Sequence, residues 1–437
     1  MGGKQGCYPL LDFRRTFCDH CVIYAEDPVK IMSTRFNMEF PGINQRRDHV
    51  LIASIILITG LGLVILYSSS YAFAFRRTGN GNFFFDRQVQ YVCAGFVLFL
   101  ISSFINLEWL RHKGVMLAMV MLTAILCLLP FIPFFAARPV NSDSMTEAAL
   151  MQNALVNSAR WIGIGGRTLQ PSELMKITLP LYLAHFFDKK KDEINNLAKS
   201  IIPPAIITGM FAGIILLQNN FSTAIFLVLN AIFMFFLAGI RFRYFFSAVF
   251  MVLPFAAIHI MNSEYRILRI LSYVIPQYEP LGASYQVNSS MSAINAGGFW
   301  GAGIGQGIRK IVSVPEIHSD FIFASYAEEM GFLGVVLFCL LFGVFAVRGY
   351  ISSIRNENPF CRLLGCGLVT MIISQVLLNI SVVSGALPAT GIPLPFFSAG
   401  GSSLVVSMVM AGLIVNISRH NNNNSANNKI FDRRGEN

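Results

Sequence analysis

Charged side chains are what this sequence has least of. Asp, Glu, Lys and Arg make up 13% of the 437 residues, whereas hydrophobic types make up 54%. A soluble domain carries about 25% charged residues. This deficit excludes a soluble enzyme, a disordered protein and a basic nucleic-acid binder, although the net charge is +10. A membrane span needs about 20 apolar residues, so the many apolar runs predict an all-α, polytopic membrane protein. The unbroken run 51–66 argues against a barrel, whose strands alternate.

A disulfide framework is not expected from the eight cysteines. Four lie in apolar runs, where a thiol behaves as a small hydrophobic group. The other four lie in segments predicted to face the reducing cytosol. Cys18 and Cys21, with His20 between them, form one CxxC motif, but a structural zinc site needs four ligands. Plain thiols are therefore favoured over zinc.

Ten apolar segments predict ten transmembrane helices. A cytoplasmic segment, 1–49, precedes the membrane domain, 50–418. The polar tail, 419–437, cannot bury a core and is expected to be disordered. The predicted spans are 50–70, 89–108, 114–136, 172–188, 199–217, 221–240, 243–261, 320–347, 364–387 and 397–418.

The distribution of Lys and Arg predicts the orientation of these spans. Loops on the side of the N-terminus hold 22 of these residues, and the loops on the other side hold 10. Because cytoplasmic loops carry the excess of positive charge, both termini are predicted to be cytoplasmic. The loops 137–171 and 262–319 then face outward, the second being a large extracytoplasmic loop between helices 7 and 8.

A first cluster of polar residues surrounds the start of the fourth predicted span. Ser172 stands where an N-cap is expected, and Glu173 falls in the first turn, where a negative charge suits the helix dipole. Lys176 lies on the same helix face as Glu173. One interpretation is a capped helix with an internal ion pair. The other is a cationic pocket of Arg160 and Lys176 that suits a pyrophosphate, with Gln170 and Glu173 as further substrate contacts.

A second cluster closes the largest outer loop. Asp320 stands at the membrane boundary beside apolar residues, where desolvation improves a carboxylate as a general base. The structural alternative is that Ser319 or Asp320 caps the eighth span. Glu316 and His318 add titratable groups within one turn, so catalysis stays open and both are candidate substrate contacts.

The glycine-rich segment 297–307 precedes this second cluster. It follows no strand and lacks the GxGxxG register, so a nucleotide site is rejected. Its glycines favour a tight, re-entrant backbone near a ligand. Just upstream, Val287, Met291 and Ile294 recur at helical spacing, which predicts a short amphipathic helix on the outer surface with Trp300 as an anchor.

A third cluster, 387–403, contains three prolines and three glycines that exclude a regular helix. Irregular backbone at membrane depth must be satisfied by protein or water. The segment is predicted to form a rigid elbow between the last two spans. Whether it also lines a cavity stays open; Thr390 and Ser398 are its candidate substrate contacts.

These clusters, in this order, resemble the SEDS family (shape, elongation, division and sporulation). The resemblance covers residues 48–418, nearly the whole membrane portion. One departure is the segment 218–223, which reads Gln-Asn-Asn-Phe-Ser-Thr where the family pattern usually reads Gln-Pro-Asp-x-Gly-Thr. The markers are Tyr67-Ser68-Ser69-Ser70, Arg160-Trp161-Ile162, Gln170-Pro171-Ser172-Glu173, Lys176, 315–323, Glu328-Glu329-Met330-Gly331 and 387–403.

The resemblance implies a peptidoglycan glycosyltransferase that polymerises lipid II at the outer face of the bacterial cytoplasmic membrane. It assigns the catalytic carboxylate to Asp320, which would act as general base in an inverting transfer. Arg160 and Lys176 are candidates to hold the leaving undecaprenyl pyrophosphate. No tightly bound cofactor is expected, and a divalent cation, Mg²⁺ or Mn²⁺, is a candidate to bridge to the pyrophosphate.

The resemblance also implies partners: lipid II, a class B penicillin-binding protein that acts as transpeptidase, other division proteins and membrane lipids. The long N-terminal segment and the loop 80–88 favour a division member, acting at the septum, over an elongation member. Two rival functions remain, a lipid II flippase and a non-catalytic scaffold that recruits the transpeptidase.

Overall fold

The computed structural model describes residues 48–132, 160–164, 167–194, 196–241, 244, 250, 254, 257–258, 260–262, 264–275, 283–307 and 319–435. These residues form a helical bundle with one short antiparallel hairpin, β1 (Ile162–Ile164) and β2 (Arg167–Leu169). The predicted all-α, polytopic fold is confirmed, and the hairpin is a small addition that the sequence did not predict.

Nine of the ten predicted spans coincide with long helices, and the seventh, 243–261, lies mostly outside the described residues. Seven described helices are long and apolar enough to cross a membrane, and α10 is apolar but shorter, so the count of ten is not established. The long helices are α3 (His49–Thr78), α4 (Phe83–Phe104), α6 (Lys113–Leu128), α8 (Ser172–Lys189), α9 (Ile202–Leu217), α10 (Phe221–Leu237), α15 (Ile322–Ile354), α16 (Pro359–Val383) and α17 (Gly401–Gly435).

The last helix differs from its prediction. The sequence predicted the end of the span at residue 418, whereas the helical backbone of α17 continues to Gly435. The predicted disorder of the tail, 419–437, stays a prediction. No proline interrupts residues 419–434. Asn and Ser lower helix propensity without breaking a helix, so the helical backbone can pass through them.

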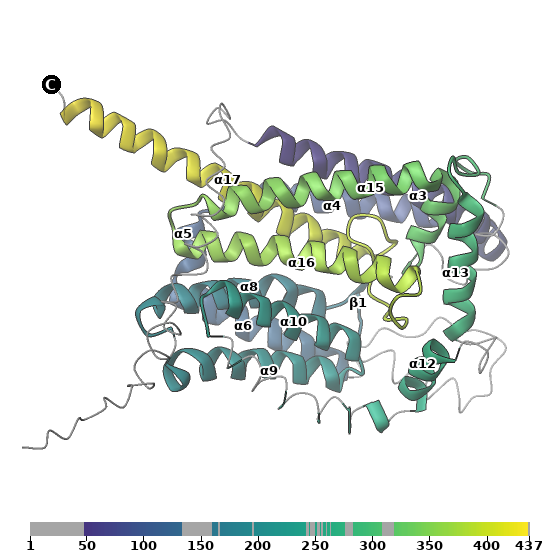
Figure 1. The fold of residues 1–437 in the computed structure, drawn as a ribbon, viewed down its shortest axis with the longest axis horizontal. Coiled ribbons are helices and arrows are strands. Elements are labelled where there is room, and N and C mark those ends of the chain that lie inside the picture. Colours follow the sequence, from purple (N-terminus) through teal and green to yellow (C-terminus); the bar gives the residue numbers. More distant parts are fainter. Residues whose placement is uncertain are drawn as a thin grey trace, which may run out of the picture. The chain divides into compact units, whose positions relative to one another are not determined.

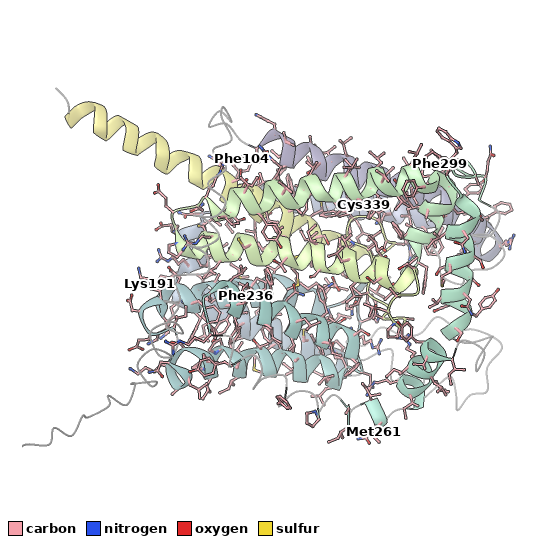
Figure 2. All side chains as sticks on the ribbon, viewed as in Figure 1. Phe104, Lys191, Phe236, Met261, Phe299 and Cys339 are labelled. Carbon is pink, nitrogen blue, oxygen red and sulfur yellow. The ribbon has the colours of Figure 1, made fainter. Side chains whose placement is uncertain are left out.

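The long helices pack side by side (Figure 1). Helix α15 lies against α3 and α16, and α17 lies along α4. At one end of the bundle, α13 (Ala283–Gly297) crosses the end of α15 (Figure 1). This is the short helix expected from Val287, Met291 and Ile294. Figure 2 shows Phe299 at that end and Lys191 at the opposite end, which separates the predicted outer and cytoplasmic loops.

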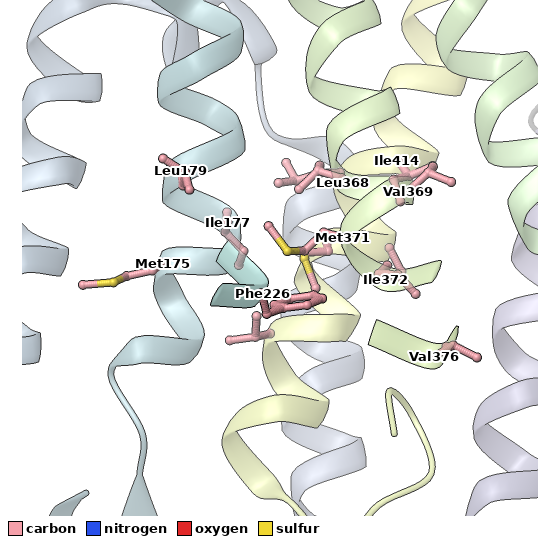
Figure 3. Close-up of a cluster of buried hydrophobic side chains, with 14 of the residues drawn as sticks. Met175, Ile177, Leu179, Phe226, Leu368, Val369, Met371, Ile372, Val376 and Ile414 are labelled. Atoms are coloured by element: carbon pink, nitrogen blue, oxygen red, sulfur yellow. The ribbon is translucent and has the colours of Figure 1, made fainter. Parts of the chain in front are cut away.

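The core of the bundle joins α8, α10, α16 and α17 (Figure 3). Phe226 and Met371 are at most 1% exposed and lie beside Ile177. Outward faces stay apolar, as for Phe332 and Leu340 on α15, which are 56% and 61% exposed. A helix that is hydrophobic all round lies either in the core of a large protein or in a membrane. Because these side chains are exposed, they agree with a multi-pass membrane protein.

Helix α15 is broken at Gly331, whose φ of 63° and ψ of −163° are not helical. The glycine-rich loop after α13 fills the break: Ala302 and Gly303 donate backbone N–H groups to the carbonyls of Glu328 and Glu329 at 2.9 and 3.0 Å. A Cβ at Gly301 would overlap the Glu329 carbonyl. These glycines therefore serve close approach to another backbone within the protein.

Candidate functional site

Asp320 lies two residues before the start of α15 and is half-buried. The helix begins at Ile322, and its N-cap position is Phe321, whose side chain makes no capping hydrogen bond. The alternative in which Ser319 or Asp320 caps the span is therefore wrong, because the chain makes one more turn before the helix starts. The Ser319 hydroxyl donates to Asp320 Oδ1 at 3.0 Å. Asp320 Oδ2 lies 3.4 Å from the place that a Cβ at Gly391 would occupy, so the carboxylate faces the third cluster.

The third cluster forms the predicted elbow, which folds back into the protein. Phe396 and Phe397 are 2% and 1% exposed, and Phe397 packs edge-on to Phe338 of α15 at 5.2 Å between centroids. Phe396 has a φ of 66°, a left-handed conformation that only a tightly packed loop imposes on a phenylalanine. The elbow is thus confirmed, while its role in lining a cavity stays a prediction.

Amide side chains from two helices satisfy the backbone of this elbow. Gln375 of α16 donates to the carbonyl of Pro393 at 2.7 Å, and Gln88 of α4 donates to that of Ser398 at 3.0 Å. The Ser398 hydroxyl accepts the N–H of Leu394 at 2.8 Å and is 4% exposed. Ser398 therefore stabilises the loop, and Thr390, which is half-buried, is the more accessible of the two predicted contacts.

The first cluster forms a buried ion pair. Lys176 is 1% exposed, and its ammonium donates to both carboxylate oxygens of Glu173 at 2.8 Å and to Gln375 Oε1 at 3.0 Å. An ammonium has three donors, and all three are used here. The structure therefore contains the internal ion pair of the first interpretation. The contribution of Lys176 to a cationic pocket with Arg160 stays a prediction.

The start of α8 also differs from its prediction. Ser172 is the first helical residue, and the N-cap position is taken by Pro171. The rigid φ of proline suits a helix start, which moves the boundary one residue earlier. Gln170, which is half-buried, donates its backbone N–H to the Ser402 hydroxyl at 3.0 Å, so the start of α8 is tied to the start of α17.

Arg160 binds the turn between α9 and α10. Its Nε donates to the carbonyl of Gln218 at 3.0 Å, and its Nη2 donates to that of Asn219. Asn219 has a φ of 56°, which asparagine tolerates and proline cannot adopt. Asn220 caps α10 by accepting the N–H of Thr223 at 3.4 Å. The proline that the family pattern usually has at this position could not adopt this turn, and Arg160 binds the turn through its backbone carbonyls.

Helix α12 (Glu264–Val274) supplies two arginines that the sequence reasoning did not single out. Arg266 donates to Asn219 Oδ1 at 3.5 Å, and Arg269 donates to the carbonyl of Ala389 at 3.0 Å. Partial burial lowers the pKa of Arg266, a guanidinium that stays protonated at neutral pH. Their spacing with Tyr273, whose hydroxyl donates to the Ala386 carbonyl at 2.9 Å, places all three on one face. This helical spacing is visible in the sequence and could have identified the two arginines as residues of one face.

These contacts bring Arg160, Arg266, Arg269 and Asp320 to the same end of the bundle. Arg160 and Arg266 share Asn219, while Arg269 and Asp320 approach the same short stretch, 389–391. Cations and one carboxylate in this arrangement can hold a phosphorylated substrate and accept a proton.

Two predicted site residues, Glu316 and His318, lie outside the described residues, as do Cys18 and Cys21 of the CxxC motif. The paired glutamates Glu328 and Glu329 are buried at 2% and 1% exposure, and Ser68 of α3 donates to Glu329 Oε1. Within the described part of the chain, no group of three or more His, Cys, Asp or Glu side chains is arranged to hold a metal ion.

Comparison with known proteins identifies a matching family. The pattern of the FtsW/RodA/SpoVE family, described as cell cycle protein, matches residues 48–423. The probable peptidoglycan glycosyltransferase FtsW of Borreliella burgdorferi is 35% identical over 382 residues, covering 87% of this chain and 99% of that protein. The stage V sporulation protein E of Bacillus subtilis is 32% identical and covers 85% of this chain and 97% of that protein.

Solved structures share the fold. A chain from a peptidoglycan synthase complex, described as coordinating polymerization and crosslinking, superposes with a TM-score of 0.69 at 24% identity, covering 86% of this chain and 98% of that one. The rod shape determining protein RodA of Thermus thermophilus gives a TM-score of 0.60 at 23% identity, covering 85% and 97%. Given the matched pattern and relatives above 30% identity along nearly their whole length, this chain belongs to the FtsW/RodA/SpoVE family of cell cycle proteins, the SEDS family.

Proposed function

We propose that this chain is a peptidoglycan glycosyltransferase that polymerises lipid II into glycan strands at the outer face of the cytoplasmic membrane, with Asp320 as general base. The relatives named FtsW, at 31–35% identity, are described as probable peptidoglycan glycosyltransferases and support the activity. The observation that carries the role of Asp320 is its place: a half-buried carboxylate, before rather than at the helix cap, facing the elbow at Gly391.

The proposed step is an inverting glycosyl transfer. Asp320 takes the proton from a sugar hydroxyl of the acceptor lipid II as that oxygen bonds to the anomeric carbon of the lipid-linked donor. The bond from this carbon to the undecaprenyl pyrophosphate oxygen breaks, and the pyrophosphate leaves with the electron pair. A positioned general base contributes about 10²- to 10⁴-fold to such a step.

The leaving pyrophosphate develops negative charge, which nearby cations stabilise. Arg160 is the predicted residue that the geometry still favours, and Arg266 shares Asn219 with it. Lys176 supports this site indirectly, since its donors are taken by Glu173 and Gln375. A divalent cation, Mg²⁺ or Mn²⁺, stays part of the proposal; its ligands would be pyrophosphate oxygens.

A role in septal wall synthesis is part of the proposal. The probable FtsW proteins of Borreliella burgdorferi and Bacillus subtilis, at 35% and 34% identity, support it. The proposed partner is a class B penicillin-binding protein; the related chain found in a peptidoglycan synthase complex supports such a pairing. The proposed location is the bacterial inner membrane with both termini in the cytoplasm, which the distribution of Lys and Arg supports.

The experiment that tests this function compares polymerisation with lipid transport. Purified full-length protein in vesicles receives lipid II, and both glycan strands and lipid II movement across the bilayer are measured for the wild type and Asp320→Asn. We expect strands from the wild type and, from Asp320→Asn, only a residual rate about 10²- to 10⁴-fold lower. Lipid II movement by both proteins with no strands from either would instead support a flippase. A variant that keeps wild-type strand formation would remove Asp320 from the mechanism.

A further inference from the structure

Asn379 of α16 joins two parts of the candidate site. It is 2% exposed, and its Nδ2 donates to the carbonyl of Asp320 at 2.8 Å and to that of Ile392 at 2.9 Å. One buried amide thus bridges Asp320, two residues before α15, and the elbow between α16 and α17. Both protons of the amide are used, so the two carbonyls are held at a fixed separation.

The orientation of this amide is determined by its neighbours. Rotating it by half a turn would place Oδ1 against the two carbonyl oxygens and leave both of them buried without a donor. Each such buried, unsatisfied group costs about 1–3 kcal/mol. In the observed orientation, Oδ1 is buried without a hydrogen-bond partner. This leaves one unsatisfied oxygen, whereas the rotated amide would leave both carbonyl oxygens without a donor.

A second amide repeats the arrangement one helical turn away. Gln375 donates to the carbonyl of Pro393, the residue after Ile392, and its Oε1 accepts from Lys176. Because an ammonium can only donate, the orientation of Gln375 is fixed as well. Residues i and i+4 lie on one helix face, so α16 holds consecutive residues of the elbow from one side. The elbow therefore cannot shift past Asp320 without breaking these bonds.

We propose that Asn379 is a positioning residue for the reaction: it sets the distance between the Asp320 carboxylate and the elbow at Gly391. This inference rests on the proposed role of Asp320. Asn379 acts through the main chain at residue 320, since its bond goes to the carbonyl. The carboxylate belongs to the same residue as that carbonyl, so a shift of the main chain at residue 320 also moves the base.

The test uses the purified full-length protein with lipid II and measures kcat and KM. Asn379→Leu keeps the size of the side chain and removes both donors. We expect kcat to fall about 10- to 100-fold, because a misplacement of about 1 Å costs that much, with KM changed less than about twofold. Asn379→Ser keeps one donor, so its kcat should lie between those of the wild type and Asn379→Leu. This variant replaces Asn379→Leu in the test if the leucine variant folds poorly.

Asn416 offers a matched control. It is 7% exposed, and its Nδ2 also donates to two backbone carbonyls, those of Ser102 and Ile105 at 2.9 and 2.7 Å, where α17 meets the end of α4. Asn416→Leu should lower thermal stability about as much as Asn379→Leu and leave kcat within about twofold, since it removes the same bonds away from Asp320. An equal fall in kcat for both variants would make the effect one of stability and overturn the inference.

A double variant separates this inference from the proposed function. Residues that act as a unit are non-additive, so adding Asn379→Leu to Asp320→Asn should lower the residual rate less than about twofold. A further 10-fold loss would overturn the inference. An inactive Asp320→Asn together with a wild-type rate for Asn379→Leu would overturn only the inference. A fully active Asp320→Asn would overturn the proposed function instead.

Discussion

Replacing Lys176 by methionine distinguishes a structural ion pair from a pyrophosphate ligand. The side chains of Lys176 and Glu173 are 2% and 4% exposed, so the variant leaves a carboxylate buried without its cation. Removing one partner of a buried pair costs about 3–5 kcal/mol. Gln375 Oε1 also loses its donor. With an unfolding entropy of about 2.1 cal/mol/K per residue, each kcal/mol lowers the Tm of a 437-residue chain by about 1 °C, so we expect a decrease of about 3–5 °C.

The buried thiols of Cys127, Cys361 and Cys366 supply the assay, because a thiol-reactive fluorophore labels them only as the protein unfolds. Replacing both members of the pair by apolar residues, Glu173→Leu with Lys176→Met, should recover most of the lost Tm, since apolar replacements of a buried pair are often neutral. A Lys176→Met variant that keeps its Tm but makes no glycan would refute the structural interpretation, and would return Lys176 to the substrate.

Two further predictions concern the frame of the site. Gly331→Ala should abolish strand formation and lower Tm, because alanine does not tolerate the backbone angles at the break of α15 and its Cβ would overlap Gly301; Gly343→Ala, in the same helix with open space around it, is the control. Asp48→Asn should lower Tm by roughly 1–2 °C with little effect on kcat, because it weakens the Arg348 pair, whose three contacts are 2.9–3.1 Å, by about 1–2 kcal/mol. An unchanged Tm for Asp48→Asn would show that this pair contributes nothing.

The helical bundle could be predicted from the sequence because long apolar runs have few alternatives. The elbow could also be predicted, since prolines and glycines exclude a helix. The boundaries were less accurate: α8 begins at Ser172 and α15 at Ile322, each displaced from the capping residue that the sequence favoured. Local capping rules compete with proline geometry and tertiary contacts, and only the folded chain decides between them.

The site was harder to predict than the fold. Asp320 was identified through its surroundings and a family resemblance, whereas Asn379 and Arg269 were missed. An amide side chain within an apolar span could have indicated a structural or functional contact, because a buried polar group needs a partner. The partners themselves could not be predicted: Asn379 meets Ile392 thirteen residues away but meets Asp320 across 59 residues, and such long-range contacts depend on how the helices pack.

The most direct test of the central claim is a structure of the full-length Asp320→Asn protein with lipid II bound. The proposed mechanism predicts a sugar hydroxyl within about 2.6–3.2 Å of the residue 320 side chain, as a general base requires. It also predicts the pyrophosphate beside Arg160. Lipid II bound with its sugars far from residue 320, or held only at the end of the bundle near Lys191, would contradict the assignment of Asp320 as the base.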